Sequence, residues 1–374
     1  MARKVIRILA CLSLIFFLVP VTYVHGPPPP PNDSQIINLQ PVEFDASSPE
    51  RNRTGRLAFL GGWKLTSENS GFGGVSAMLL LPEDRFFMLS DAGVLIGFTL
   101  NAELNRAERP FIAPLPDGPP KENPHARLNW DAESLLYDPE TQRFWVGFER
   151  QHGVWRYSRA FARKESMWRV PAMAKWPING GAEAMLRLPD GRYLVFSETA
   201  EYEKGGSQAL IFDGDPSEPG TDSELFGYQP PKGYRLTDAT LLPDGSALLL
   251  HRRFTPLQGV SAILSIGDPG EIAAGEVWTS RRIALLKPPM KVDNMEALAV
   301  SEEMHEGKPA TIIWIASDDN FQAIQETILL KFRLLKGRKR PTKKRAAPKT
   351  EKAGEGPGSS FLQSEKSGQP EGKQ

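Results

Sequence analysis

Three glutamates occupy the same place in three similar stretches of the sequence. Glu133 lies in DAESLLYDPETQRFWVGFER, Glu183 in GGAEAMLRLPDGRYLVFSE and Glu296 in DNMEALAVSEEMHEGKPATIIWIASDDN. Each glutamate stands at the start of an apolar run, which is followed by a turn and by a second apolar run ending on charged residues. Carboxylates that the fold brings together can act as general acids and bases, or as ligands of a hard cation such as Ca²⁺.

Two further stretches follow the same plan and extend the repeat. FGGVSAMLLLPEDRFFMLSDAG begins at Phe72 and TDATLLPDGSALLLHRRF at Thr237, with Val75 and Ala239 at the glutamate position. The five copies recur at steps of 50 to 58 residues, and their apolar runs have the length of strands. A period of this size made of short strands and tight turns predicts an all-β protein with the β-propeller architecture.

The segments before the first copy bear on the number of blades. IINLQPVEFD and GRLAFLGGWKLTS read as strands, and we expect them to complete a sixth blade that joins strands from both ends of the body. Such a closure removes the exposed edges of the sheets. The sequence therefore predicts a six-bladed propeller.

In a propeller the first strand of each blade lines the central channel, so residues at one repeat position converge on one axis. We expect a ring of carboxylates at the channel mouth, and Ca²⁺ or another divalent cation is the remedy for their mutual repulsion. The candidate metal ligands are Asp131, Glu133, Glu183, Asp238, Asp293 and Glu296, with Asn129, Asn179 and Asn294 as neutral oxygen donors.

The ends of the second runs supply further candidates for the channel mouth. These are Asp91, Glu149, Glu198, Asp318, Asp319 and Asn320. In the fourth copy Arg252 and Arg253 replace the acid, and an arginine there either neutralises the ring or grips an anionic substrate. His125 and His251 are candidates for proton transfer because their neighbours face the channel.

Charge and motif content exclude several classes of function. Residues 27–330 hold 29 Lys and Arg against 41 Asp and Glu, so the body repels phosphate backbones and nucleic-acid binding is not expected. The one cysteine, Cys11, lies outside this body. The chain has no His-Glu-x-x-His zinc helix, no phosphate-binding P-loop and no complete Gly-x-Ser-x-Gly elbow, which makes Ser76 a weak candidate nucleophile.

Composition divides the chain into four parts. Residues 1–26 combine a basic start with an apolar stretch from Ile8 to Val24, which is typical of a signal peptide or membrane anchor and predicts export to the periplasm. Residues 27–35 form a Pro-rich spacer, 36–335 the propeller and 336–374 a disordered basic tail. The anchor or the tail would attach the protein to the envelope, and a monomer is expected.

The five motifs, taken in order, resemble the bacterial family described as "esterase-like activity of phytase". The resemblance rests on FGGVSAM with LSDAG, DAESLL with FWVGFER, GAEAMLRLPDGR, TDATLLPDGSALLLHRRF, and DNMEALAV with ASDDNFQAIQETILLKF. It implies an exported propeller that acts on phosphate or carboxylic esters. Members often have Gly after the motif acid, where this chain has Ser134, Ala184 and Ala297.

Three functions follow as hypotheses. The first is a metal-dependent hydrolase of small anionic esters that uses the carboxylate ring. The second is a non-catalytic propeller that binds a ligand or an envelope partner and holds calcium for stability. The third is a lactonase-like sugar hydrolase, because other six-bladed propellers carry a carboxylate-bound cation at this place.

Overall fold

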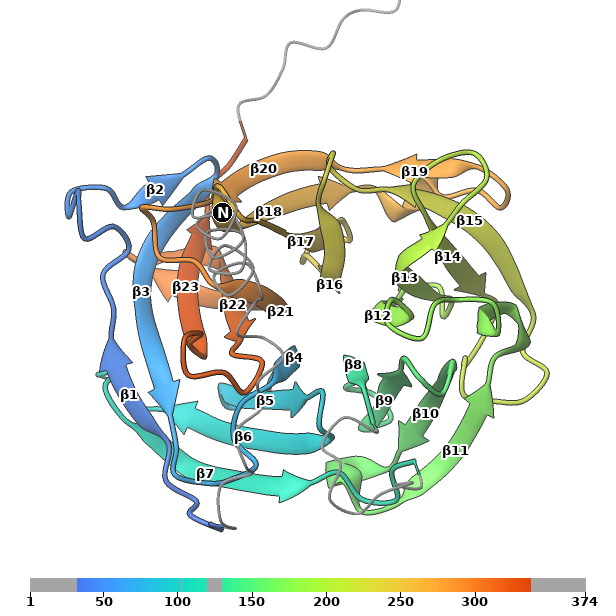
Figure 1. The fold of residues 1–374 in the computed structure, drawn as a ribbon, viewed down its shortest axis with the longest axis horizontal. Helices are drawn as coiled ribbons and strands as arrows, with labels where there is room; N and C mark the ends of the chain where they lie inside the picture. The colour runs from blue at the N-terminus through green and yellow to red at the C-terminus, as the bar shows by residue number, and fades with distance from the viewer. Residues whose placement is uncertain (1–31, 102, 120–129, 338–374) are drawn as a thin grey trace, which may run out of the picture. The chain divides into compact units, whose positions relative to one another are not determined.

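The chain folds into five sheets arranged in a ring around a central axis, as the computed structural model in Figure 1 shows. The structure describes residues 32–101, 103–119 and 130–337. The predicted N-terminal leader and nearly all of the basic tail lie outside these residues, as does His125. No helix in the described ranges is long and apolar enough to cross a membrane. The all-β propeller is confirmed.

Four of the five blades follow one another along the chain, each with its inner strand first. Blade 1 contains β4 (Val75–Leu81), β5 (Arg85–Ser90), β6 (Val94–Leu100) and β7 (Ala107–Pro114). Blade 2 contains β8 (Ala132–Asp138), β9 (Arg143–Phe148), β10 (Gly153–Tyr157) and β11 (Lys164–Arg169). Blade 3 contains β12 (Ala182–Arg187), β13 (Tyr193–Glu201), β14 (Ser207–Phe212), β15 (Ser223–Gln229) and β19 (Val277–Thr279).

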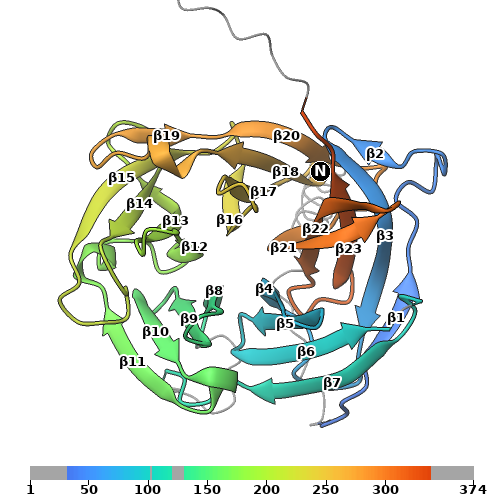
Figure 2. The same ribbon diagram turned by 180° about the vertical axis from the view of Figure 1, so that it is seen from behind.

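Blade 4 contains β16 (Arg235–Leu241), β17 (Ala247–Thr255), β18 (Gly259–Gly267) and β20 (Arg281–Leu286). Three short 3₁₀ helices lie in connections: η3 (Arg159–Phe161), η4 (Pro171–Met173) and η5 (Pro269–Glu271). Figure 2, from behind, shows the inner strands β4, β8, β12 and β16 around the same centre.

Blade 5 is built from both ends of the body. β21 (Asn294–His305), β22 (Lys308–Asp318) and β23 (Ile328–Leu334) are its first three strands, and β3 (Leu57–Thr66) pairs antiparallel with β23 as the fourth. β1 (Asn38–Pro41) and β2 (Arg53–Thr54) both pair with β3. The prediction of six blades was therefore wrong, because the N-terminal strands complete the blade of the fifth copy and form no blade of their own. Closure by strands from both ends is what the structure has.

Five hydrophobic clusters hold the ring together, and each lies between two neighbouring blades. Because most strands are covered on both faces by adjacent blades, they read as continuous apolar runs such as ALLLH in β17. The cluster between blades 4 and 5 includes Leu250, Ile315 and Phe332. Phe332 packs against Phe44 and Phe59, with ring centroids 5.7 Å away in each case, so the closing strand is fixed by aromatic contacts.

Removal of one of these aromatic side chains should destabilise the closed propeller. The Phe332 side chain is fully buried, and we expect Phe332→Ala to lower the free energy of unfolding by about 3–5 kcal/mol through lost burial and a cavity. Phe254→Ala is the matched control, because Phe254 is 67% exposed and its removal should change stability by less than about 0.5 kcal/mol. Urea unfolding measures both. Equal effects of the two substitutions would contradict the assigned closure.

Candidate functional site

A β-bulge near the start of each inner strand sets the geometry of the channel. At this point every inner strand has one residue more than its partner strand, so the extra residue stands outside the ladder pairing. The five extra residues are Ser76, Glu133, Glu183, Thr237 and Glu296. The equivalent positions in blades 1 and 4 are therefore Ser76 and Thr237, whereas the sequence repeat was aligned on Val75 and Ala239.

The two hydroxyl residues at the bulge position link neighbouring blades. Ser76 Oγ donates to the carbonyl of Ala132 at 2.5 Å, and Thr237 Oγ1 donates to the carbonyl of Met295 at 3.1 Å. Both acceptors directly precede the bulged glutamate of the next blade. These bonds tie blade 1 to blade 2 and blade 4 to blade 5, and so help to position Glu133 and Glu296.

The second strand of each blade ends beside the bulge and adds a second set of side chains. Main-chain pairing places these residues at one equivalent position: Asp91, Glu149, Glu198, Arg252 and Asp318. Arg252 of blade 4 therefore occupies the position that an acid holds in the other four blades. Gly74 has φ +64° and leaves room for the Asp91 carboxyl, which would lie 2.5 Å from a Cβ at this position.

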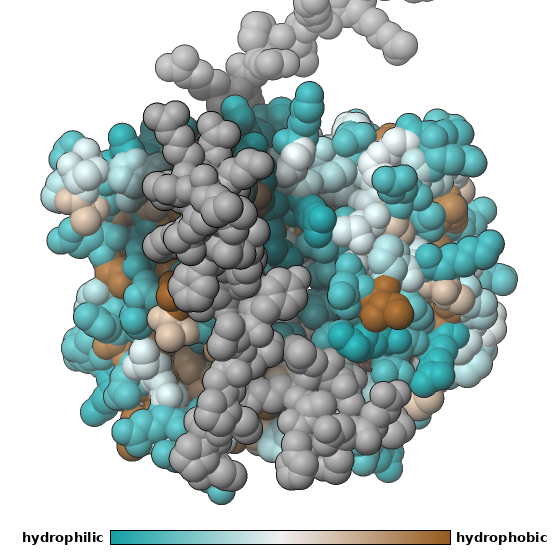
Figure 3. Space-filling view, in the orientation of Figure 1, coloured by the Kyte–Doolittle hydropathy of each residue, from teal (hydrophilic) through white to brown (hydrophobic). Residues whose placement is uncertain are grey.

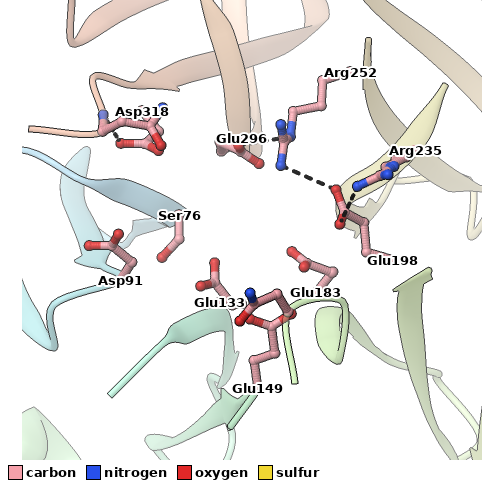
Figure 4. Close-up of a pocket in the computed structure, with 12 residues that line it drawn as sticks. Ser76, Asp91, Glu133, Glu149, Glu183, Glu198, Arg235, Arg252, Glu296 and Asp318 are labelled. Atoms are coloured by element: carbon pink, nitrogen blue, oxygen red, sulfur yellow. Dashed lines mark hydrogen bonds and ion pairs between the residues drawn. The ribbon is translucent and has the colours of Figure 1, made fainter. Parts of the chain in front are cut away.

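All residues of these two sets except Thr237 line a cavity of about 270 Å³ at the end of the ring where the inner strands begin, which we call the mouth. Figure 4 shows their side chains pointing into the cavity from all five blades. The lining residues are Ser76, Asp91, Glu133, Glu149, Asn179, Glu183, Glu198, Arg235, Arg252, Glu296, Asp318 and Asn320. The cavity therefore combines seven carboxyl groups with two guanidinium groups.

The two arginines neutralise only one side of the mouth. Arg252 lies 2.9 Å from Glu296 and 3.1 Å from Glu198, and Arg235 lies 3.2 Å from Glu198. Glu296 holds the pKa of Arg252 above its usual value, so this guanidinium stays charged. Arg235 is the residue that sequence reasoning missed. Its signal is the spacing of Arg235 and Thr237, which matches Asp131 and Glu133 once the bulge is aligned.

The remaining carboxyl groups differ in how they are held. Glu149 accepts the backbone N–H of Gly181 at 2.7 Å, and Asp318 accepts the backbone N–H of Asn320 at 2.6 Å. Glu133 and Glu183 have no hydrogen bond or ion pair with any residue that the structure describes. These two carboxyl groups are therefore available to bind a ligand.

Burial and mutual repulsion raise the pKa of most of these acids. Burial raises the pKa of Asp91, Glu149 and Glu296 to about 7, for Glu296 against the opposing effect of Arg252. The pKa values of Glu133 and Glu183 are raised well above the usual range, first by burial and then by neighbouring carboxylates. The mouth therefore holds protons near neutral pH unless another positive charge enters it.

Three acids that the sequence placed in the metal ring lie outside the mouth cavity. Asp131 pairs with Arg150, and Asp293 accepts the backbone N–H groups of Asn294 and Glu326. Asp238 accepts the N–H groups of Ala239 and Leu298, both at 2.7 Å, and lines a separate cavity of about 220 Å³ with mainly apolar walls. Each is used by the backbone or by a local arginine.

The other predicted residues also fall into two groups. His251 is fully buried between Tyr228 and the carbonyl of Ile263, and burial lowers its pKa to about 4. Arg253 stacks on Tyr234, and Asp319 accepts the N–H of Gly74 at 2.9 Å. None of these three lines the mouth cavity. Eleven residues named from the sequence do: Ser76, Asp91, Glu133, Glu149, Asn179, Glu183, Glu198, Arg252, Glu296, Asp318 and Asn320.

The mouth fits a hard cation in its donor chemistry. Five of its carboxyl groups are not paired with arginine, and Asn179 and Asn320 add amide oxygens, which is the type of donor that Ca²⁺ takes. In the described ranges no three Asp, Glu, His or Cys side chains already converge at ligand distance. A bound ion would have to draw Glu133 and Glu183 inward from the walls.

The raised pKa values predict how stability depends on pH in metal-free protein. An acid whose pKa is raised by folding binds more protons in the folded state, so its contribution is present below the unfolded pKa and is lost as pH rises through the folded pKa. We expect the urea concentration at the unfolding midpoint to decrease as the pH rises from about 4 through 7, because these carboxyls titrate over that range. Glu183→Gln should flatten this fall and stabilise the protein at pH 8.

Glu140→Gln, at an exposed turn position, is the matched control and should leave the profile unchanged. A midpoint that rises steadily from pH 5 to pH 8 in wild-type protein would contradict the buried charge excess.

Comparison with known proteins places this site in a family. Among solved structures, the luciferin-regenerating enzyme is 11% identical with a TM-score of 0.39, covering 78% of this chain and 95% of that one. The holo form of the pyranose dehydrogenase PQQ domain from Coprinopsis cinerea is 10% identical with a TM-score of 0.36, covering 70% and 94%. Similarities this weak do not bear on activity.

No curated protein matches the chain in sequence. The family model described as "Phytase-like: Esterase-like activity of phytase" matches residues 70–321, which span four whole blades and the first two strands of blade 5. All twelve residues of the mouth cavity lie within this match. The chain therefore belongs to the phytase-like family.

Proposed function

We propose that this protein is a hydrolase of small anionic esters, either of phosphoric or of carboxylic acids, with its active site in the mouth cavity. The observation that carries the proposal is the pair Glu133 and Glu183, two carboxyl groups in the cavity wall without a partner in the described residues, in a cavity that also holds two arginines. After burial, Glu133 is the strongest influence on the pKa of Glu183, so the two act on the same space.

The pair can divide the proton transfers of hydrolysis between them. Because the two carboxyls repel each other, one stays protonated when the other ionises. The ionised carboxylate accepts a proton from water as the water oxygen attacks the acyl carbon or the phosphorus. The protonated carboxyl donates its proton to the departing alkoxide oxygen. The products are an alcohol and the free acid, and the two glutamates exchange protonation states.

The arginines give the site its preference for an anion. Arg252 is held between Glu198 and Glu296. Among the residues that the structure describes, Arg235 pairs with Glu198 alone, and its side chain is 59% exposed. Arg235 therefore keeps N–H groups for a phosphate or carboxylate oxygen at the entrance. Because Arg235 and Arg252 both lie on blade 4, they would orient the substrate with its ester group toward blades 2 and 3, which carry Glu133 and Glu183.

A divalent cation in the mouth would take the place of the proton held by the pair: it would offset the excess negative charge and, in place of the protonated carboxyl, polarise the ester oxygen as a Lewis acid. Asp91, Glu133, Glu149, Glu183 and Asp318 are the residues that would hold it. We also propose export, from the leader-like composition of residues 1–26.

Substitution of the two glutamates tests the proposal. Glu133→Gln and Glu183→Gln should each lower kcat/KM by about 10²-fold or more, because general acid–base catalysis contributes about 10²–10⁴-fold. The assays are hydrolysis of p-nitrophenyl phosphate, p-nitrophenyl acetate and a panel of lactones. Glu140→Gln is the control, because it removes the same charge at an exposed position outside the cavity. Full activity in both variants would exclude the mechanism, and hydrolysis of lactones alone would favour the lactonase hypothesis.

Calorimetry tests the cation independently of activity. Binding of Ca²⁺ should displace protons from carboxyls with raised pKa, so the heat at pH 7 should depend on the ionisation enthalpy of the buffer. Glu183→Gln should reduce both the affinity and the number of protons released. Binding without proton release, or none at millimolar Ca²⁺, would contradict a cation site in the mouth. Binding with no hydrolysis of any ester would favour a non-catalytic binding propeller.

A further inference from the structure

Large apolar side chains are exposed mainly at one end of the ring. Of the eight that stand out among the described residues, five lie at the mouth end, two on outer strands and one at the opposite end. The five are Ile36 (64% exposed), Ile178 (60%), Phe254 (67%), Leu257 (98%) and Ile324 (72%). We call this set the apolar rim.

The position of the rim follows from the connections that carry it. Ile178 lies in the connection that enters β12, next to Asn179 of the cavity wall. Phe254 and Leu257 lie at the hairpin between β17 and β18, and Ile324 lies between β22 and β23. These connections all belong to the end of the ring where the inner strands begin, so the apolar tips lie at the same end as the polar opening. Figure 3 shows apolar side chains standing singly among hydrophilic ones on this face.

The described chain also begins at this end. The backbone N–H of Ser70 donates to the carbonyl of Asn32 at 3.0 Å, and Ser70 lies in the connection that enters β4. The apolar stretch from Ile8 to Val24 is joined to Asn32 by residues 25–31. Seven residues span at most roughly 25 Å, so an anchor formed by this stretch would hold the mouth end close to the bilayer.

We propose that the mouth end docks on a lipid bilayer, with the apolar rim inserted at the interface and the opening facing the membrane. Separate apolar tips at one end of the ring, together with an apolar stretch joined to that end by a short linker, suit a lipid surface, whereas a protein partner is typically bound by one contiguous patch. The proposal does not depend on ester hydrolysis.

Site-specific fluorescence tests the proposal with a control on the opposite end. In a Cys11→Ser background, Leu257→Cys and, separately, Met304→Cys are labelled with the environment-sensitive dye NBD. Met304 is 69% exposed and lies in β21 near its hairpin with β22, at the end away from the mouth. The full-length chain is added to vesicles of phosphatidylethanolamine and phosphatidylglycerol.

We expect a blue shift and higher intensity for the label at position 257, with quenching by nitroxide-labelled lipids, and no change at position 304. Attachment through the anchor alone would leave both labels in water and would overturn the proposal. Equal changes at both positions would mean non-specific adsorption, and no association with vesicles would exclude docking. A shift at position 257 that depends on protein concentration without lipid would assign the rim to a second copy of the chain.

Discussion

The structure of the mouth depends on one electrostatic imbalance. Seven carboxyl groups share a cavity with two guanidinium groups, and burial prevents water from screening them. Arg252 pairs with Glu198 and Glu296, and Arg235 pairs with Glu198, so the imbalance falls on the other five acids. Raised pKa values are the result in the free protein. A bound cation, or an anionic substrate that brings a cation with it, would replace the protons.

The fold creates this imbalance by repetition. Each blade has a bulge near the start of its inner strand and a polar residue at the end of its second strand, and the ring turns these ten positions toward one axis. The inter-blade clusters and the closing strand β3 make the ring rigid. Repulsion between the acids is therefore offset by packing elsewhere in the ring. The function that we propose uses the mouth, where polar side chains of all five blades meet.

Much of this could be predicted from the sequence, because a repeat of strand-length apolar runs reports the architecture directly. Glu133, Glu183, Glu296 and Arg252 were found because each sits at a repeat position. The blade number was wrong because strands from both ends of a chain can share one sheet, which a linear repeat cannot reveal. Asp238 was wrongly predicted to lie in the mouth for a related reason. The bulge shifts the repeat by one residue, and this aspartate accepts hydrogen bonds from backbone N–H groups outside the cavity. Arg235 was missed through the same shift.

The most direct test of the account is infrared spectroscopy of the carboxyl groups in metal-free protein at pH 7. We expect a band from protonated carboxyls that weakens in Glu183→Gln and also weakens when Ca²⁺ displaces protons from the mouth. Fully ionised carboxyls at pH 7 without any metal would contradict it, because the mouth would then tolerate its negative charge without protons or a cation.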